Sequence, residues 1–237
     1  MKECIQVGML GLGTVGTGVA KVLCQNGANI AHKVGKPIVL KTVLVRDVKK
    51  ERSLPQPVQV TDKIEDILND TEIDIVIEVM GGEEPAKDYM LRAMQAGKHV
   101  VTANKDVVAQ HGKELFAAAE EAQVDFLFEA SVGGGIPIIR PLKQCLAGNH
   151  IYEVMGIVNG TTNYMLTKMT QEGLDFADVL AEAQAKGYAE ADPTADVGGL
   201  DAARKLAILA SIAFNARVTF DDVYVEGITN ISSEDIA

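Results

Sequence analysis

The sequence predicts an α/β fold in which a doubly wound parallel sheet is followed by a smaller α/β region. Through the first half of the chain, short branched apolar runs alternate with helix-like stretches, which is typical of parallel strands covered by helices on both faces. A glycine-rich turn stands between the first run and the first helix. After a second glycine-rich loop, Gly133–Pro137, helical patterns dominate. These observations predict two regions, 1–136 and 137–237.

The first region alternates between strands and helices. Its strands are expected at about 4–10, 38–46, 58–61, 73–79, 98–102 and 124–128, where branched apolar residues dominate. Its helices are expected between these runs, at about 14–25, 62–69, 84–96 and 112–122. An insertion at about 26–37 delays the second strand. This order of elements is that of a parallel sheet connected by helices.

The second region is expected to contain one strand among several helices. The helices are expected at about 138–147, 161–171, 175–186 and 197–214, and the strand at about 151–158. In the last helix, Asp201 and Lys205 fall on one face with Ile208 and Ile212, because side chains three and four apart are neighbours. A charge at the edge of a core is costly unless it is paired or used. Lys205 is therefore either half of an ordinary helix ion pair or a functional cation.

Composition excludes several classes of protein. With 237 residues, 47% of them hydrophobic, the chain can form one large domain or two modest ones. Its longest apolar runs are too short to span a bilayer, and no secretory signal precedes the first strand. Three scattered cysteines favour reduced thiols, so we expect a cytoplasmic protein. A net charge of −11 argues against a nucleic-acid partner.

The first glycine-rich turn predicts a dinucleotide site of the Rossmann type. In Gly11-Leu-Gly13-Thr14-Val15-Gly16, the first glycine permits a tight turn, the second lets the backbone approach a pyrophosphate, and the third lets helix and strand pack closely. The N–H groups at the start of the helix then face the anion. A merely tight glycine turn is the alternative, and the strand–turn–helix context favours the dinucleotide.

The end of the second strand bears on which dinucleotide binds. The acidic residue expected about 20 residues after the glycine turn is not cleanly present, and the strand ends in Arg46 and Asp47. Arg46 suits the 2′-phosphate of NADP, whereas Asp47 would suit the ribose hydroxyls of NAD. Lys49 and Lys50 fit a solvated strand end equally well. We expect NADP, with NAD as the open alternative.

Four stretches, in the right order, resemble the homoserine dehydrogenase family. They are Gly11–Gly16, Val79–Ala86, Gly97–Lys105 and Ala183–Lys205. The resemblance covers essentially the whole chain and implies NAD(P)-dependent interconversion of L-aspartate 4-semialdehyde and L-homoserine, a step of threonine, methionine and isoleucine biosynthesis. It also implies a small amino-acid substrate.

The resemblance implies catalytic roles for two lysines. Lys205 would be the acid and base that exchanges a proton with the aldehyde oxygen, and Lys105 would line the nicotinamide and substrate site. Hydride transfer to a carbonyl leaves negative charge on oxygen, so a positioned cation lowers the barrier. Without the resemblance, a structural role explains Lys105 as well, as a lysine that caps a helix after Thr102–Asn104.

The resemblance likewise implies a substrate cluster and an ion site. Glu190 and Asp201 match positions that hold the substrate ammonium group, Asp196 joins them, and Gly160 and Thr161 belong to a substrate-side loop that begins at Asn159. The family cages a sodium ion with main-chain oxygens that match Glu129, Val132, Gly134 and Ile136. Backbone carbonyls suit such a hard cation, although a plain strand-to-helix turn also explains the loop.

The family's catalytic unit continues beyond the position that matches residue 237. The chain therefore resembles a form truncated at its C-terminus, with region 137–237 an incomplete substrate-binding and oligomerisation region. The complete protein is expected to be a homodimer or a higher homo-oligomer. A non-catalytic NAD(P)-binding module, or a fragment of a split enzyme, is the alternative. A phosphorylating semialdehyde dehydrogenase fits poorly, because it needs an activated cysteine and Cys145 falls late in an expected helix.

Overall fold

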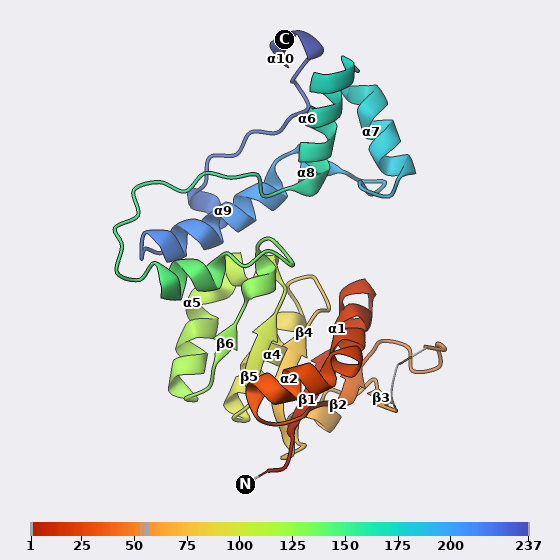
Figure 1. Cartoon of the computed structure of the whole chain (residues 1–237), viewed down its shortest axis with the longest axis vertical. Coiled ribbons are helices and arrows are strands. Elements are labelled where there is room, and N and C mark those ends of the chain that lie inside the picture. Colours follow the sequence, from red (N-terminus) through yellow and green to blue (C-terminus); the bar gives the residue numbers. More distant parts are fainter. Residues whose placement is uncertain (1, 53, 55–56, 237) are drawn as a thin grey trace. The chain divides into compact units, whose positions relative to one another are not determined.

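The computed structural model describes residues 2–52, 54 and 57–236. The chain folds as two compact units, Met1–Gly135 and Ile136–Ala237 (Figure 1). Each unit has its own cluster of buried apolar side chains. The first unit carries the sheet, and the second consists of helices and loops.

The first unit is built on a six-stranded sheet in which every adjacent pair of strands is parallel. The strand order β3-β2-β1-β4-β5-β6 reverses direction between β1 and β4, which creates a switch point at the carboxyl edge of the sheet. The predicted doubly wound α/β sheet is confirmed. The strands are β1 (Ile5–Leu10), β2 (Ile38–Leu44), β3 (Gln59–Thr61), β4 (Ile73–Glu78), β5 (His99–Thr102) and β6 (Phe126–Leu127).

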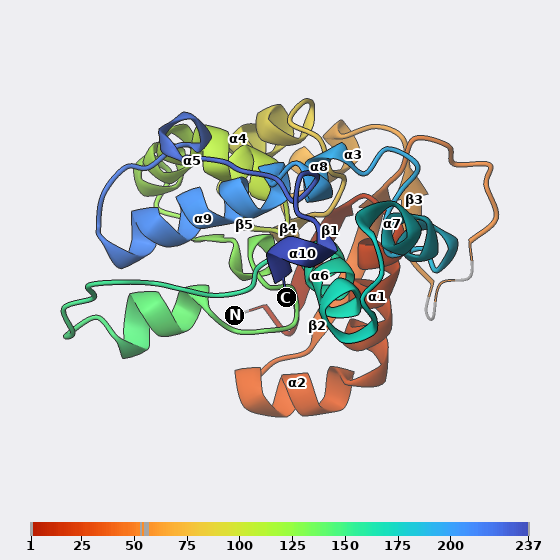
Figure 2. The same ribbon diagram turned by 90° about the horizontal axis from the view of Figure 1, so that it is seen from above.

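Helices cover both faces of this sheet. Figure 2 shows α1 (Thr14–Gln25) and α2 (Gly27–Val34) on one face, and α4 (Ala86–Gln95) and α5 (Lys105–Glu121) on the other. The connections between parallel strands are right-handed. Because the strand order runs from β1 toward β3 in one half of the sheet and from β4 toward β6 in the other, the connecting helices of the two halves lie on opposite faces. A short helix, α3 (Glu65–Leu68), precedes β4.

Apolar side chains fill the space between the sheet and its helices. On the α1 side, Val7, Met9, Leu40, Val43 and Ala20 are each at most 1% exposed and form one cluster. The helices of the opposite face contribute fully buried side chains of their own, Met90, Met94 and Leu115. Burial on both faces explains why the strands read as continuous branched apolar runs rather than as alternating ones.

Two element boundaries in the first unit differ from the prediction. The insertion at about 26–37 contains α2, which ends at Gly35 in the left-handed conformation that glycine tolerates. α5 begins at Lys105, not near residue 112, because the Asn104 side chain accepts a hydrogen bond from the backbone N–H of Val107. Asp106 in the first turn adds a favourable charge at this end of the helix.

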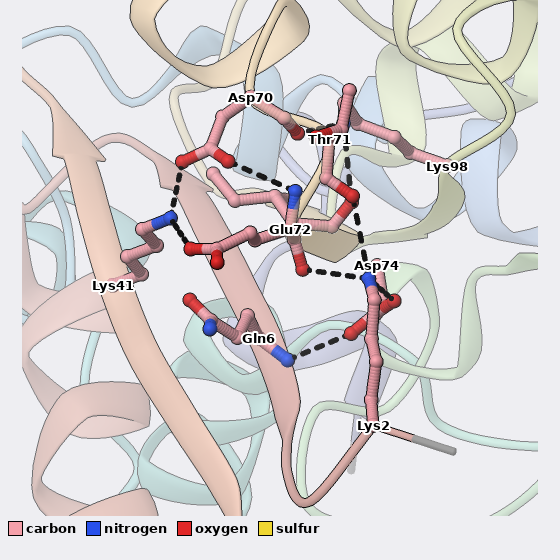
Figure 3. Close-up of polar contacts among 9 residues, drawn as sticks. Lys2, Gln6, Lys41, Asp70, Thr71, Glu72, Asp74 and Lys98 are labelled. Atoms are coloured by element: carbon pink, nitrogen blue, oxygen red, sulfur yellow. Dashed lines mark hydrogen bonds and ion pairs between the residues drawn. The ribbon is translucent and has the colours of Figure 1, made fainter.

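At the amino-terminal edge of the sheet, lysine side chains hold the turn that precedes β4 (Figure 3). Lys98 is only 3% exposed, and its Nζ donates to the carbonyl oxygens of Asp70 and Ile73, at 2.6 and 3.1 Å. Burial lowers the pKa of Lys98. Lys41 of β2 forms ion pairs of 2.6 Å with both Asp70 and Glu72, and their hydrogen bonds raise its pKa. These contacts fix the start of β4 against its neighbours.

The second unit is helical. Met165, Met169, Val179 and Ala183 are each at most 2% exposed and lie between α6 and α7. No helix in the described part of the chain is both long and apolar enough to cross a membrane. The helices of this unit are α6 (Gly160–Glu172), α7 (Phe176–Ala185), α8 (Thr194–Val197), α9 (Leu200–Ala213) and α10 (Ser233–Ile236).

The prediction of a strand at about 151–158 is wrong. Among the described residues of the second unit there is no strand, so this unit is not the α/β region that the sequence predicts. A strand needs a neighbour to complete its ladder of hydrogen bonds, and the segment exposes its large side chains instead. Tyr152, Met155 and Ile157 are 84%, 84% and 78% exposed.

Two predicted helices of the second unit are also shorter than expected. The helix predicted at about 138–147 is helical over 139–145, of which Pro141–Cys145 form a π-helical turn. The helix predicted at about 197–214 starts at Leu200, because Gly199 adopts a left-handed φ of 80° and separates α8 from α9. A left-handed residue cannot continue a right-handed helix.

Candidate functional site

The glycine turn after β1 has the geometry that its sequence predicts. Gly11 has a φ of 99°, and a Cβ at this position would approach the carbonyl oxygen of Val79 to 2.8 Å. A Cβ on Gly16 would collide with the carbonyl oxygen of Gly11, whereas a Cβ on Gly13 would have no described atom within 4 Å. The first and third glycines are therefore required by packing, and the second leaves space in front of the turn.

The start of α1 is suited to an anion. Gly13 is the N-cap residue, and none of the described side chains caps this end of the helix. The first N–H groups of a helix have no partner within it, and here they belong to Thr14, Val15 and Gly16. Together with the helix dipole they form the positive end of a 12-residue helix. A phosphate group fits this arrangement.

The end of β2 lies beside this turn, since the Gly11 N–H donates to the carbonyl oxygen of Leu44 at 3.0 Å. Arg46 and Asp47 follow after Val45 and are both exposed. The Asp47 carboxylate accepts the backbone N–H of Lys49 at 2.9 Å, within its own loop. Both side chains therefore lie close to the glycine turn, and one oxygen of Asp47 is engaged within its own loop.

Lys105 is the first residue of α5 and is half-buried. A cation at the positive end of a helix is electrostatically unfavourable, so helix stability does not explain why a lysine stands there. The lysine follows β5 in the parallel sheet, at the same carboxyl edge as the glycine turn. The structure thereby places it on the side of the switch point opposite to Arg46.

Lys205 lies in a polar cluster of the second unit. Its Nζ donates to the Asp201 carboxylate at 2.6 Å and to the carbonyl oxygen of Val158 at 2.7 Å. The two side chains are 17% and 10% exposed. The predicted pairing of Asp201 with Lys205 is confirmed, and the pair is largely withdrawn from solvent, unlike most ion pairs on a helix surface.

Asn159 connects this pair to Asp196. Its Nδ2 donates to Asp196 at 2.7 Å and to Asp201 at 2.9 Å, and its Oδ1 accepts the backbone N–H of Thr162 at 2.8 Å. The side chain is 7% exposed. One amide therefore caps α6 and joins it to α8 and α9. Sequence reasoning missed this role, because the partners of Asn159 lie 37 and 42 residues away.

The other expected substrate residues lie near this cluster but do not all join it. Thr161 donates its hydroxyl to the carbonyl oxygen of Tyr188 at 2.9 Å, and Gly160 starts α6. Glu190 is exposed in the loop between α7 and α8. Among the described residues, no hydrogen bond or ion pair joins its carboxylate to the cluster.

A cavity of about 560 Å³ opens beside the cluster. Its walls come from the segment that precedes α6, from one side of α6 and from Ala202 of α9. Val158 and Asn159, which hold Lys205 and Asp201, both line it, whereas Lys205 and Asp201 are not among its described lining residues. The cavity is large enough for an amino acid, and α6 contributes polar side chains, Thr162, Asn163, Thr167, Thr170 and Gln171.

The expected ion-binding loop contains a sharply turning backbone. Glu129 starts a 3-10 turn, and Gly133 and Gly135, on either side of Gly134, have φ values of 62° and 85°. Ile136 belongs to the other unit, whereas Glu129, Val132 and Gly134 belong to the first. In the described chain, this loop included, no group of three or more His, Cys, Asp or Glu side chains is arranged to hold a metal ion.

Two family models match the chain. The model described as "Homoserine dehydrogenase, NAD binding domain" matches residues 11–129, and the model described as "Homoserine dehydrogenase" matches residues 137–237. Among curated proteins, the chain is 51% identical over 236 residues to the homoserine dehydrogenase of Bacillus subtilis and 52% identical over 234 residues to that of Corynebacterium glutamicum. These alignments cover 99% of the chain and 54% and 53% of the two relatives. The chain spans about half the length of the curated relatives it matches.

Solved structures show the same similarity. The crystal structure of a homoserine dehydrogenase from Thiobacillus denitrificans has a TM-score of 0.94 and 48% identity, over 98% of this chain and 54% of that one. A putative homoserine dehydrogenase from Archaeoglobus fulgidus has a TM-score of 0.85 and 34% identity, over 98% of this chain and 75% of that one. A hyperthermophilic archaeal homoserine dehydrogenase mutant in complex with NADPH has a TM-score of 0.81 and 25% identity, over 97% and 75%.

Proposed function

Because the chain belongs to the homoserine dehydrogenase family, we propose that it carries the NADP-binding and catalytic parts of an enzyme that interconverts L-homoserine and L-aspartate 4-semialdehyde. The observation that carries this proposal is the cluster around Lys205. It holds an ammonium group between a buried carboxylate and a backbone carbonyl, beside a cavity of suitable size. The glycine turn after β1 supports the cofactor half of the proposal.

NADP is the proposed cofactor, with NAD as the second choice. The start of α1 would bind the pyrophosphate, with contacts from Gly11, Gly13, Thr14, Val15 and Gly16. Arg46 would pair with the 2′-phosphate, since a guanidinium matches phosphate geometry. The NADPH complex of the archaeal relative supports this choice. When bound, the nicotinamide supplies the hydride in one direction and accepts it in the other.

Lys205 is the proposed proton donor and acceptor. Two of its three N–H bonds point to Asp201 and Val158, which would leave the third to meet the substrate oxygen. During aldehyde reduction, negative charge grows on that oxygen, and an ammonium group at hydrogen-bond distance stabilises it and delivers the proton. In the reverse direction the neutral amine takes the proton from the hydroxyl. Asp201 keeps the lysine oriented throughout.

The remaining residues have proposed supporting roles. Lys105 would stand next to the nicotinamide and polarise the substrate. Asp196, Asp201 and Glu190 would attract the substrate ammonium group, and Gly160 and Thr161, at the start of α6, would contact the substrate. Carbonyl oxygens of Glu129, Val132, Gly134 and Ile136 would hold a sodium ion, for which the glycine-rich turn and its oxygen donors are suited.

The complete protein is proposed to act in the cytoplasm as a homodimer or higher homo-oligomer. The exposed apolar segment around Tyr152, Met155 and Ile157 supports association with further chain, because it leaves large apolar side chains in solvent.

An absorbance assay tests the proposed activity. Purified protein is mixed with L-homoserine and either NADP or NAD, and reduced nicotinamide is followed at its absorbance band. We expect reduction of NADP, with slower reduction of NAD because Arg46 favours the 2′-phosphate. The alternative function, a non-catalytic NADP-binding module, predicts that NADPH binds but that neither cofactor is reduced, even when the chain is extended to the length of its relatives, and this result would contradict the proposed enzyme. Activity that appears only in the extended chain would instead show that the catalytic parts need the additional residues.

A further inference from the structure

Three buried polar side chains lie at the carboxyl ends of β4 and β5. Glu78, Thr102 and Asn104 are 0%, 1% and 5% exposed. Glu78 is the last residue of β4 and follows the apolar run Ile75–Ile77, and a buried carboxylate is costly unless its oxygens accept hydrogen bonds. Neither the glycine turn nor the Lys205 cluster uses these residues, so their presence requires another explanation.

Both oxygens of the Glu78 carboxylate are engaged. Oε1 accepts the backbone N–H of Met80 at 2.7 Å, and Oε2 accepts the hydroxyl of Thr102 at 2.5 Å. The Thr102 hydroxyl oxygen in turn accepts the backbone N–H of Asn104 at 2.9 Å. One carboxylate therefore determines the course of the chain just after β4 and, through Thr102, just after β5.

Asn104 closes the network between the two loops. Its Nδ2 donates to the carbonyl oxygen of Gly82 at 2.7 Å, and its Oδ1 caps α5. Gly81 and Gly82 have φ values of 76° and 75°, a conformation that glycine adopts readily and that needs external contacts to hold it in one place. The loop after β4 is thus tied to the residue that precedes Lys105.

This network lies beside the proposed cofactor site. A Cβ on Gly11 would lie 2.8 Å from the carbonyl oxygen of Val79 and 3.1 Å from Cα of Met80, so the glycine turn packs directly on the loop after β4. In a sheet of this order, a dinucleotide crosses the switch point between β1 and β4. If the adenosine half lies over β2 and Arg46, the nicotinamide half lies over β4 and β5.

We propose that Glu78, Thr102 and Asn104 are positioning residues that hold the loops after β4 and β5 in place for the nicotinamide half of the cofactor and for Lys105. This inference rests on the proposed NADP site. In this arrangement the Glu78 carboxylate orients backbone groups near the nicotinamide, whereas the glycine turn binds the phosphates.

Substitution of Thr102 tests the network without requiring turnover. Thr102→Val removes the hydroxyl that joins Glu78 to Asn104. We expect the affinity for NADPH, measured by its fluorescence, to fall about tenfold, the effect of one lost hydrogen bond. The affinity for 2′-phospho-ADP-ribose, which lacks the nicotinamide and is measured by calorimetry, should change by less than about twofold. Thr102→Ser keeps the hydroxyl and should restore NADPH binding.

Thr61 provides a matched control. It ends β3, is 6% exposed, donates its hydroxyl to the Asp66 carboxylate and accepts the backbone N–H of Lys63 at 3.0 Å. Thr61→Val therefore removes the same kind of network from an edge strand, and it should leave NADPH affinity unchanged. Glu78→Gln keeps the shape of the carboxylate but not its charge and should weaken NADPH selectively, which provides a second test if Thr102→Val does not fold.

Three results would overturn the inference. Equal losses of NADPH and 2′-phospho-ADP-ribose affinity would show that the network supports the fold rather than the nicotinamide end. Unchanged NADPH affinity in Thr102→Val and Glu78→Gln would remove the positioning role and leave the proposed cofactor site intact. Failure of the wild-type protein to bind NADPH or NADH at all would reject the cofactor site itself.

Discussion

Asn159 connects several elements of the cluster around Lys205 through its side chain. Its Nδ2 donates to Asp196 and Asp201, and its Oδ1 accepts both the N–H and the hydroxyl of Thr162. An amide can make these contacts because it is a donor at one end and an acceptor at the other. The same residue therefore separates two carboxylates and fixes the start of α6.

Asn159→Asp should damage the cluster with almost no change of shape. The new carboxylate would face Asp196 and Asp201 without a hydrogen to donate, and like charges at this distance repel each other. We expect a loss of about 2 kcal/mol in the free energy of unfolding in urea and a fall in turnover of L-homoserine of about 100-fold. The measurement pairs urea titration with the absorbance assay.

Asn163→Asp is the control for this substitution. Asn163 is exposed on the same helix and borders the same cavity, but among the described residues its side chain makes no hydrogen bond to Asp196 or Asp201. Its substitution should change the unfolding free energy by less than about 0.5 kcal/mol. If Asn159→Asp behaves like Asn163→Asp, the amide does not organise the cluster.

Contacts of single residues could be predicted from the sequence where both partners lie in the same helix. The spacing of Asp201 and Lys205 predicted their ion pair, because neighbours on a helix follow from periodicity. Sequence reasoning missed the roles of Asn159 and Glu78, whose partners come from other elements. The available signal for Glu78 was an acidic residue at the end of an apolar run, but such a residue fits a solvated strand end equally well.

At the scale of elements, the parallel strands could be predicted and the segment at 151–158 could not. The strands of the first unit are bounded by helices and turns and are buried on both faces, so composition alone marks them. The segment at 151–158 has strand-like composition, but a strand forms only against a partner. The described second unit offers none.

The contact between α6 and α7 predicts a dependence of stability on pH. Lys186 and the Tyr164 hydroxyl, which donate hydrogen bonds to Glu182, lower the pKa of its carboxyl from 4.5 to about 2. A lowered carboxyl pKa stabilises the fold above the unfolded value and loses this effect as the pH falls through the folded value. The stabilisation should therefore be complete above pH 4.5 and disappear toward pH 2.

Thermal melts of wild type and Glu182→Gln measure this effect. The wild type should melt at a higher temperature near pH 6, and the difference should shrink steadily as the pH falls from 4.5 toward 2. Lys186→Met should reduce the same pH-dependent difference, because it removes the main donor to Glu182. A difference in melting temperature that is constant from pH 6 to pH 2 would show that Glu182 does not stabilise the α6–α7 contact through its charge.

At the scale of the whole molecule, the two units divide the proposed chemistry between them. The first carries the glycine turn, Arg46 and Lys105 on one edge of a parallel sheet. The second carries Lys205 and the acidic residues around it on helices. The sequence predicted the order of these parts because the motifs are contiguous, and it predicted the helices of the second unit. It did not predict that this unit lacks a strand, because strand formation depends on a pairing partner that no local pattern reveals.

The measurement that tests the central claim most directly is the turnover of L-homoserine by Lys205→Met, together with its NADPH affinity. Lys168→Met is the control, because Lys168 also forms a 2.6 Å pair with a carboxylate one helical turn away, Glu172. We predict that Lys205→Met loses at least about 100-fold in turnover with unchanged NADPH binding, and that Lys168→Met keeps both. Near-full turnover in Lys205→Met, with cofactor binding intact, would contradict the role of Lys205 and with it the proposed mechanism.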